Sequence, residues 1–432
     1  MSDKTFEIGF GRGKLTFTLP AEKIIQEIDG RPVEPITDIP AAVRHALNHP
    51  IGTPPLKEIV KSGESVVIVV SDITRAWIRH DQFLPTLLDE LNAAGIPDSD
   101  ISIVVALGAH RPHTPEEDIL VCGKAVCDRV AVYQHDAFNE ENLAYIGTTS
   151  GGTAAYINKQ VAEADRFILT GGIVYHLMAG FGGGRKSVIP GISGYKSIQA
   201  NHTFCLHKEV GKGLNPNCGS GMLDANDMNK DCCEYTALAK PDFLLNAVFT
   251  PDGKFAKFVA GQWHDAWLEG TKAVEQIYGI PVAERADLVV ASAGGFPKDI
   301  NLYQGSKTID NAYLAAKPGG VVICCLECPD IYEPPEFSDW FKHPTLLEHE
   351  LALRAGFTVP GYVAFKCANI AREVSLIIVT KPENADFIRN AGMIPAASAE
   401  EATAIAREKL GREDYSVILM GHAANTVPVL GR

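Results

Sequence analysis

Apolar runs alternate with segments of helical periodicity through the first half of the chain. The runs that predict strands are residues 65–72, 101–110, 129–136 and 165–172. The helical patterns are FLPTLLDELNAAG (83–95) and the stretch that begins TPEEDILVCG at Thr114. Strands that are apolar throughout and alternate with helices are typical of a parallel sheet covered on both faces. This half is predicted to be α/β.

A second α/β pattern follows. Residues 6–19 predict an initial hairpin, and residues 242–263 predict two β segments around Pro251-Asp252-Gly253. Further strand patterns lie at 288–295, 320–327, 374–380 and 416–422, with a helical pattern at 398–410. The prediction is two α/β domains with mainly parallel sheets and a ligand cleft between them. Residues 1–280 form the cofactor-binding and catalytic domain, and residues 281–432 close the cleft.

Length and charge narrow the class of protein. A chain of 432 residues exceeds the ~250–300 residues at which one core stops growing. The net charge of −14 argues against a nucleic-acid surface. No run approaches the roughly 18 apolar residues of a membrane span, and the start lacks a secretory pattern. We expect a cytoplasmic protein with its ten cysteines reduced, those of CCLEC (324–328) serving as buried small side chains.

The glycine-rich stretch Gly171 to His202 holds the densest candidate chemistry. It could be a flexible surface loop, as an isolated triple glycine usually is. It could be a phosphate loop, because Gly180 to Ser187 nearly matches G-x-x-x-x-G-K-S, with Arg185 in place of the second glycine. The third interpretation is a cofactor site in which Lys186 supplies an amine nucleophile and His202 a metal ligand.

Polar residues follow the predicted strands at one edge. Asp72 closes the first strand, His110 closes the second, and His176 lies just beyond a third. Ligands of open α/β sheets bind beyond the carboxyl ends of the strands. Structural alternatives stay open: Asp72 is also suited to capping a helix, and His110 to a loop contact. His113, His135 and His207 are interpreted as loop histidines.

Four motifs, spread over both halves, carry a family resemblance. They are SDITR (71–75), GAHRPHT (108–114), HLMAGFGGGRKSVIPGISGYKSIQANH (176–202) and SAGGFPKDINLYQGSK (292–307). In this order the motifs resemble those of the nickel-dependent lactate racemase family.

The resemblance implies a cofactor and a set of site residues. The family carries nickel in a pincer cofactor, a pyridinium-3,5-bisthiocarboxylic acid mononucleotide. By resemblance Lys186 attaches it covalently and His202 ligates nickel, while His110 and His176 act as acid and base. The substrate contacts correspond to Arg75, Gln304, Lys307 and, less closely, Lys298. Asp72, Gly183 and Gly184 are expected at the cofactor, and valine at either glycine is expected to weaken cofactor retention while leaving the fold intact.

The implied reaction is racemisation or epimerisation at C2 of a 2-hydroxy acid. Direct removal of the C2 proton beside a carboxylate is difficult, whereas hydride removal coupled to loss of the hydroxyl proton gives a neutral ketone. The 2-oxo acid then rotates and takes the hydride back on its other face. Two imidazoles are expected because the two enantiomers present their hydroxyls on opposite sides, and a histidine of reference pKa ~6.5 both accepts and donates protons.

Some positions depart from the family, and other functions stay open. Ala76-Trp77 follows Arg75, where the family often has proline, and Arg79, His80 and Arg111 add positive charge that would suit a second carboxylate or a polyhydroxyl chain on the substrate. The alternatives are a nucleotide-dependent transferase that uses the near phosphate loop, and a nickel-cofactor binding or storage protein. The expected partners are the 2-hydroxy acid and the cofactor-biosynthesis proteins that load the enzyme, with no nucleic acid and no membrane.

Overall fold

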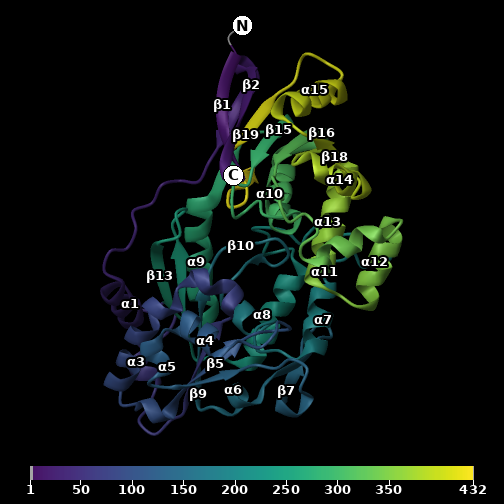
Figure 1. Ribbon diagram of the computed structural model, residues 1–432. Helices are drawn as coiled ribbons and strands as arrows, with labels where there is room; N and C mark the ends of the chain where they lie inside the picture. Colours follow the sequence, from purple (N-terminus) through teal and green to yellow (C-terminus); the bar gives the residue numbers. More distant parts are fainter. Residues whose placement is uncertain (1–2, 432) are drawn as a thin grey trace. The chain divides into compact units, whose positions relative to one another are not determined.

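The computed structural model describes residues 3–431 and divides into two compact units (Figure 1). Unit 1 comprises Met1–Arg31, Leu206–Asn215 and Tyr278–Arg432. Unit 2 comprises Pro32–Cys205 and Pro216–Ile277. Among the described residues, no helix has the length and apolar character needed to cross a membrane.

Unit 2 is built on a six-stranded sheet of order β13-β12-β9-β4-β5-β6. All neighbouring strands are parallel except β13, which returns antiparallel to β12 through the predicted turn. The bounds are β4 (Val66–Ser71), β5 (Ile101–Ala106), β6 (Ala131–Gln134), β9 (Arg166–Gly172), β12 (Phe243–Phe249) and β13 (Phe255–Gly261). The predicted parallel α/β sheet is confirmed.

Helices and two small β ribbons complete unit 2. The ribbons pair β7 (Leu143–Thr148) with β8 (Ala154–Asn158), and β10 (Tyr175–His176) with β11 (Gly180–Phe181). The α-helices are α1 (Ile39–Asn48), α2 (Leu56–Ile59), α3 (Leu84–Ala93), α4 (Pro115–Cys122), α5 (Lys124–Cys127), α6 (Lys159–Glu163), α7 (Tyr195–Thr203), α8 (Asp227–Ala239) and α9 (Trp263–Tyr278). The 3-10 helices are η2 (Ile73–Ile78), η3 (His80–Gln82), η4 (Asp98–Asp100), η5 (Glu140–Asn142) and η6 (Gly184–Ser187).

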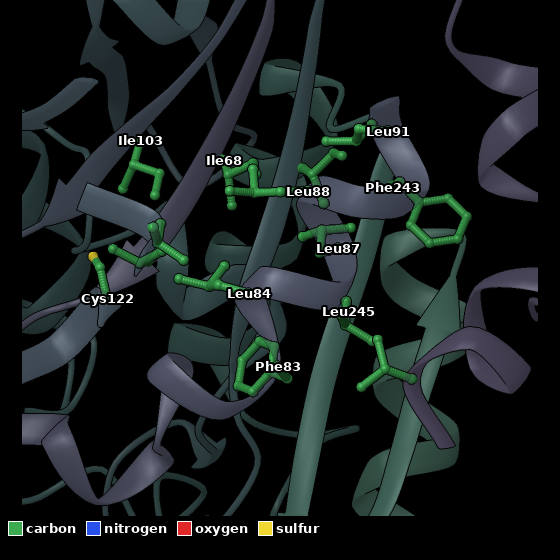
Figure 2. Close-up of a cluster of buried hydrophobic side chains, with 14 of the residues drawn as sticks. Ile68, Phe83, Leu84, Leu87, Leu88, Leu91, Ile103, Cys122, Phe243 and Leu245 are labelled. Atoms are coloured by element: carbon green, nitrogen blue, oxygen red, sulfur yellow. The ribbon is translucent and has the colours of Figure 1, made fainter. Parts of the chain in front are cut away.

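The core of unit 2 forms where α3 covers the sheet. Leucines spaced three and four residues apart share one face of a helix, and in α3 this face is fully buried. Figure 2 shows these leucines gathered with Ile68 of β4 and Ile103 of β5 in one apolar cluster. The face consists of Leu84, Leu87, Leu88 and Leu91. This packing fixes the strands whose carboxyl ends carry the candidate site.

Unit 1 holds a second six-stranded sheet, entirely parallel, of order β18-β17-β16-β15-β19-β3. Its strands are β3 (Ile24–Ile28), β15 (Ala286–Ser292), β16 (Ala316–Cys325), β17 (Ser375–Val379), β18 (Ile394–Ala396) and β19 (Val417–Met420). The predicted hairpin is β1 (Asp3–Phe10) with β2 (Gly13–Pro20), and β14 (Gly279–Val282) pairs with β20 (Val427–Leu430). The helices are α10 (Leu302–Ala315), α11 (Pro335–Ser338), α12 (Leu346–Ala355), α13 (Val359–Glu373), α14 (Ala385–Asn390), α15 (Ala399–Leu410), η1 (Ala21–Lys23), η7 (Asp339–Lys342) and η8 (Pro382–Asn384).

These units differ from the expected domains 1–280 and 281–432 in two places. Residues 1–31 group with unit 1 because β3 pairs with β19 near the other end of the chain, and Figure 1 shows the purple start of the chain beside this unit's yellow and green strands. Residues 206–215 also belong to unit 1. The buried carboxylate of Glu350 accepts the amide protons of Gly211 (3.0 Å) and Gly213 (2.8 Å).

The cysteines of CCLEC are buried small side chains, as the sequence predicts. Cys324 and Cys325 are buried on β16, and Cys328 is buried just beyond it. No disulfide forms among the cysteines of residues 3–431. Burial raises the pKa of each of these three thiols, so they are poor nucleophiles.

Candidate functional site

Three adjacent strands deliver the polar residues predicted for the rim of unit 2. Asp72 follows β4, His110 lies beyond β5, and His176 follows β9 on the short strand β10. Strands β9, β4 and β5 are neighbours in the sheet and run parallel, so these residues share its carboxyl edge.

Asp72 and His110 form a hydrogen-bonded dyad. The Asp72 carboxylate is only 1% exposed and accepts the Nδ1 proton of His110. It also accepts hydrogen bonds from Thr74 Oγ1 (2.7 Å) and Arg75 Nη1 (3.1 Å). Burial raises the pKa of Asp72, but the His110 bond and the Arg75 charge outweigh it and lower the pKa to about 2. The charged carboxylate holds His110 as the tautomer with its lone pair on Nε2.

His176 is held in the opposite tautomer. Its Nδ1 accepts the backbone amide protons of Met178 (3.2 Å) and Ala179 (3.1 Å) inside the β10–β11 ribbon. A neutral imidazole carries one N–H, which in His176 must therefore be on Nε2. Burial lowers the pKa of His176 well below its usual value, and the charge of Lys186 acts in the same direction. His176 is a neutral donor.

Lys186 projects from η6, the 3-10 turn that follows the triple glycine. Burial lowers the pKa of its amine to about 8, and the positive charges of Arg185 and Arg75 contribute in the same direction. Within residues 3–431, neither Lys186 nor Arg185 forms an ion pair with a carboxylate. A lysine amine in this state is partly neutral near pH 8 and therefore nucleophilic.

Buried neighbours restrict the space around Gly183 and Gly184, which precede Lys186 and have a left-handed backbone conformation. Gly183 and Gly184 have positive φ (67° and 52°), and the amide of Gly184 donates to Asn246 Oδ1 at 2.7 Å. A Cβ on Gly184 would lie 2.6 Å from the Trp267 ring, and one on Gly183 would lie 2.8 Å from Asn246. The expectation that valine at these positions would leave the fold intact is wrong, because the side chain would overlap buried neighbours.

The buried Arg185 side chain holds the glycine-rich loop in place through hydrogen bonds. It is fully buried, donates to the carbonyls of Phe181 (3.1 Å) and Ala179 (2.6 Å) and to Asn229 Oδ1 (2.7 Å), and lies 3.8 Å over the Trp267 ring. The chain from Gly180 to Ser187 forms β11 and the short turn η6. A phosphate loop wraps its ligand between a strand and a full helix, so that interpretation finds no support here.

Asn246 and Trp267 were missed by sequence reasoning. Besides accepting the Gly184 amide, Asn246 is fully buried in β12, and Trp267 donates Nε1–H to Gly182 O at 3.0 Å. Asn246 lies 62 positions beyond Gly184 and Trp267 lies 85 positions beyond Gly182, and no local pattern connects them to the loop.

His202 is buried in α7 with a defined tautomer. Its Nδ1–H donates to Ile198 O at 2.8 Å, which places the lone pair on Nε2. Burial lowers its pKa to about 3, as does the Lys186 charge, so the ring is neutral, as a metal ligand must be. Within residues 3–431, no three His, Cys, Asp or Glu side chains gather in an arrangement that would hold a metal by themselves.

The candidates of unit 1 lie at the start of α10. Asn301 Oδ1 accepts the Gln304 amide at 2.8 Å and caps the helix. Lys307 Nζ donates to Gln304 Oε1 at 3.2 Å, so the two side chains share a face as their spacing predicts. Burial lowers the pKa of Lys298, against the opposing charge of Asp29. Substrate binding by these three residues stays a prediction.

Comparison with known proteins gives one consistent answer. The family model described as the lactate racemase N-terminal domain matches residues 10–213, and the C-terminal domain model matches residues 282–427. The chain is 33% identical to a lactate racemase of Thermoanaerobacterium thermosaccharolyticum, with 93% of each chain covered. It is 32% identical to a lactate racemase of Lactiplantibacillus plantarum, covering 85% of this chain and 86% of the relative.

Solved structures agree in fold. The lactate racemase apoprotein from Thermoanaerobacterium thermosaccharolyticum superposes with a TM-score of 0.86 at 31% identity, covering 99% of this chain and 100% of that one. A Thermotoga maritima protein at 17% identity shares the fold, with a TM-score of 0.61 over 93% of this chain and 100% of that one. Two family models and two relatives matched over most of their length establish that this chain belongs to the lactate racemase family of isomerases.

Proposed function

We propose that the protein inverts C2 of lactate or a closely related 2-hydroxy acid by proton-coupled hydride transfer. The observation that carries this proposal is the pair of imidazoles at one sheet edge with complementary tautomers. His110 offers a lone pair on Nε2, and His176 offers a proton on Nε2. The group that accepts the hydroxyl proton returns it when the hydride comes back, and the substrate oxygen needs a hydrogen-bond donor beside it.

In this proposal His110 Nε2 accepts the substrate hydroxyl proton. The Asp72 carboxylate stabilises the imidazolium that results, as a buried carboxylate does in other acid–base dyads. His176 donates a hydrogen bond to the substrate oxygen and stabilises it as charge develops there. Arg75 holds the substrate carboxylate; its side chain is 45% exposed and its direction is fixed through Asp72 and Thr74.

The residues present fit a nickel pincer nucleotide. Lys186 would attach it through its nucleophilic amine, and His202 Nε2 would ligate nickel. The positive charges of Arg185 and Lys186, which lack a carboxylate partner within residues 3–431, suit an anionic ligand. When bound, the group would supply the position that receives and returns the C2 hydride. We include cofactor-biosynthesis proteins among the partners, since attachment needs the completed nucleotide.

The surrounding charges favour a substrate with one carboxylate. Three residues near the motifs were expected to add positive charge for a second carboxylate. Arg79 instead pairs with Asp81 (3.0 Å), and Arg111 pairs with Glu117 (2.6 Å). His80 is buried, and burial lowers its pKa to about 3, so it is neutral. These partners remove the reason to expect a dicarboxylate and support lactate.

Intact mass and nickel content test the proposal. The protein is co-expressed with the cofactor-making enzymes as wild type, Lys186→Ala and the control Lys196→Ala, an exposed lysine paired with Glu140. A covalent adduct with about one nickel per chain, lost only in Lys186→Ala, is expected, together with interconversion of D- and L-lactate. Loaded wild type without adduct, nickel or interconversion of any 2-hydroxy acid would overturn it, and ATP binding would then be tested.

A further inference from the structure

His113, predicted to be an ordinary loop histidine, is buried and bonded at both ring nitrogens. Its Nε2 accepts the backbone amide proton of Ile73 at 2.8 Å, and its Nδ1 lies 2.9 Å from Asp118 Oδ1. An amide nitrogen only donates, so Nε2 must be the acceptor, and Nδ1–H therefore donates to the Asp118 carboxylate. The ring has one defined orientation and one defined tautomer.

Gln134 at the end of β6 locks this arrangement. Its Oε1 accepts the His113 amide proton at 2.7 Å, and its Nε2 donates to His113 O (3.2 Å) and Asp118 Oδ2 (3.1 Å). Asp118 in turn sits in the first turn of α4, which begins at a capping box formed by Thr114 and Glu117. Both the backbone and the ring of His113 are thus held from two elements.

The bond from Ile73 to His113 holds the backbone directly after Asp72. Asp72 is the N-cap residue of η2, and an aspartate there ordinarily accepts a bond from the amide of the second or third residue of its helix. In this turn the Asp72 carboxylate accepts no bond from the described amides of η2. His113 satisfies the first amide from outside. The Asp72 carboxylate is left to bind His110 and Arg75.

We propose that His113 is a positioning residue for proton transfer. It binds the first amide of η2 and so fixes the backbone from which the Asp72 carboxylate reaches Nδ1 of His110. The inference rests on the proposed function in one respect, that His110 exchanges a proton with substrate. The structural part, a link from His113 through Ile73 and Asp72 to the His110 tautomer, is testable without cofactor.

Two substitutions separate the bonds of His113. His113→Gln places an amide oxygen near the position of Nε2 and retains an acceptor for Ile73. His113→Asn reaches only the position of Nδ1, so it retains a contact to Asp118 and loses the Ile73 bond. The readout is the side-chain ¹⁵N spectrum of His110 in the cofactor-free protein, which reports the tautomer and the exchange rate of its Nδ1 proton.

We expect wild type and His113→Gln to show one His110 tautomer with a slowly exchanging Nδ1 proton. His113→Asn should show mixed tautomers and fast exchange. In the loaded enzyme kcat should fall by roughly 10- to 100-fold in His113→Asn with little change in KM, because the base is displaced while Arg75 still binds substrate. His113→Gln should restore most of kcat.

A wild-type His110 spectrum in His113→Asn would overturn the proposal. If that variant does not fold, Asp118→Ala gives the same test, because it removes the acceptor of the His113 Nδ1 proton and lets that proton move to Nε2, where it faces the N–H of Ile73. An unchanged His110 tautomer there would equally overturn it. A perturbed His110 spectrum combined with full racemase activity in His110→Gln would instead uphold the link and refute the proposed role of His110.

Discussion

His110 and His176 carry their ring protons on opposite nitrogens. His110 gives its Nδ1 proton to Asp72, whereas Nδ1 of His176 receives two backbone amide protons. The two imidazoles are therefore not interchangeable before substrate binds: His110 is ready to accept a proton and His176 to donate a hydrogen bond.

His176→Asn tests this difference. The asparagine Oδ1 can replace Nδ1 as acceptor for the amides of Met178 and Ala179, but no donor remains at the position of Nε2. The variant should keep the wild-type melting temperature and lose about 10²-fold or more in kcat. His176→Phe, which also removes the acceptor, should lose both. Wild-type turnover in His176→Asn would leave His176 a purely structural role.

Asp72→Asn tests the dyad from the carboxylate side. The neutral amide cannot stabilise a His110 imidazolium and no longer enforces the tautomer, so kcat/KM should fall about 10²- to 10⁴-fold for both lactate enantiomers. Asp81→Asn, which weakens an ion pair with Arg79 outside the dyad, is the control and should leave kcat/KM near wild type. Equal rates in the two variants would contradict the dyad.

The buried His80 makes stability depend on pH. Both of its ring nitrogens lack a hydrogen-bond partner among the described residues, and burial lowers its pKa to about 3. The unfolded chain takes up a proton below ~6.5, whereas the folded protein does so only near 3. The unfolding free energy therefore falls as pH drops from ~6.5 towards 3, by up to ~1.4 kcal/mol per pH unit.

His80→Leu should remove this contribution. Urea unfolding from neutral pH to about two units below 6.5 should show a decline in unfolding free energy that is smaller by about 2 kcal/mol in the variant than in wild type. His45→Leu, at an exposed position of α1, should leave the wild-type slope unchanged. Parallel curves for all three proteins would show that His80 is not the cause.

Gly184→Ala tests whether the glycine loop is shaped by packing. The new Cβ would meet the Trp267 ring at 2.6 Å in a backbone with φ of 52°. Gly63 also has positive φ (90°), but a Cβ there meets nothing within 4 Å. Gly63→Ala measures the backbone strain alone, and Gly184→Ala should cost about 1–3 kcal/mol more unfolding free energy. Equal costs in urea titrations would show that Trp267 yields without penalty.

The carboxyl edge of the unit 2 sheet was predictable because each of these strands is a continuous apolar run, with a polar residue following within a few positions. That pattern predicted the position of Asp72, His110 and His176 after these strands, and their roles stay a prediction. The residues that orient them were not predictable. The partner of His113 is a backbone amide forty positions earlier, and Asn246 of β12 accepts the amide proton of Gly184, 62 positions earlier. Such contacts depend on how strands are ordered, which no local period encodes.

The same limit explains the difference in domain boundaries. β3 is five residues long and carries an ordinary IIQEI pattern, yet it forms the edge of a sheet whose neighbouring strand, β19, begins at Val417. Glu350 holds Gly211 and Gly213 through backbone amides, which leave no trace in residue type. Composition and periodicity do not predict contacts that are made through backbone groups.

The division of unit 1 into three stretches of chain has a consequence during synthesis. When the ribosome reaches Ile277, every residue of unit 2 has been made. Unit 1 then consists only of Met1–Arg31 and Leu206–Asn215, whose partners β19 and Glu350 are not yet translated. We therefore expect nascent unit 2 to fold first, carrying two pieces of unit 1 whose partner segments are missing, and the last third of the message to supply those partners.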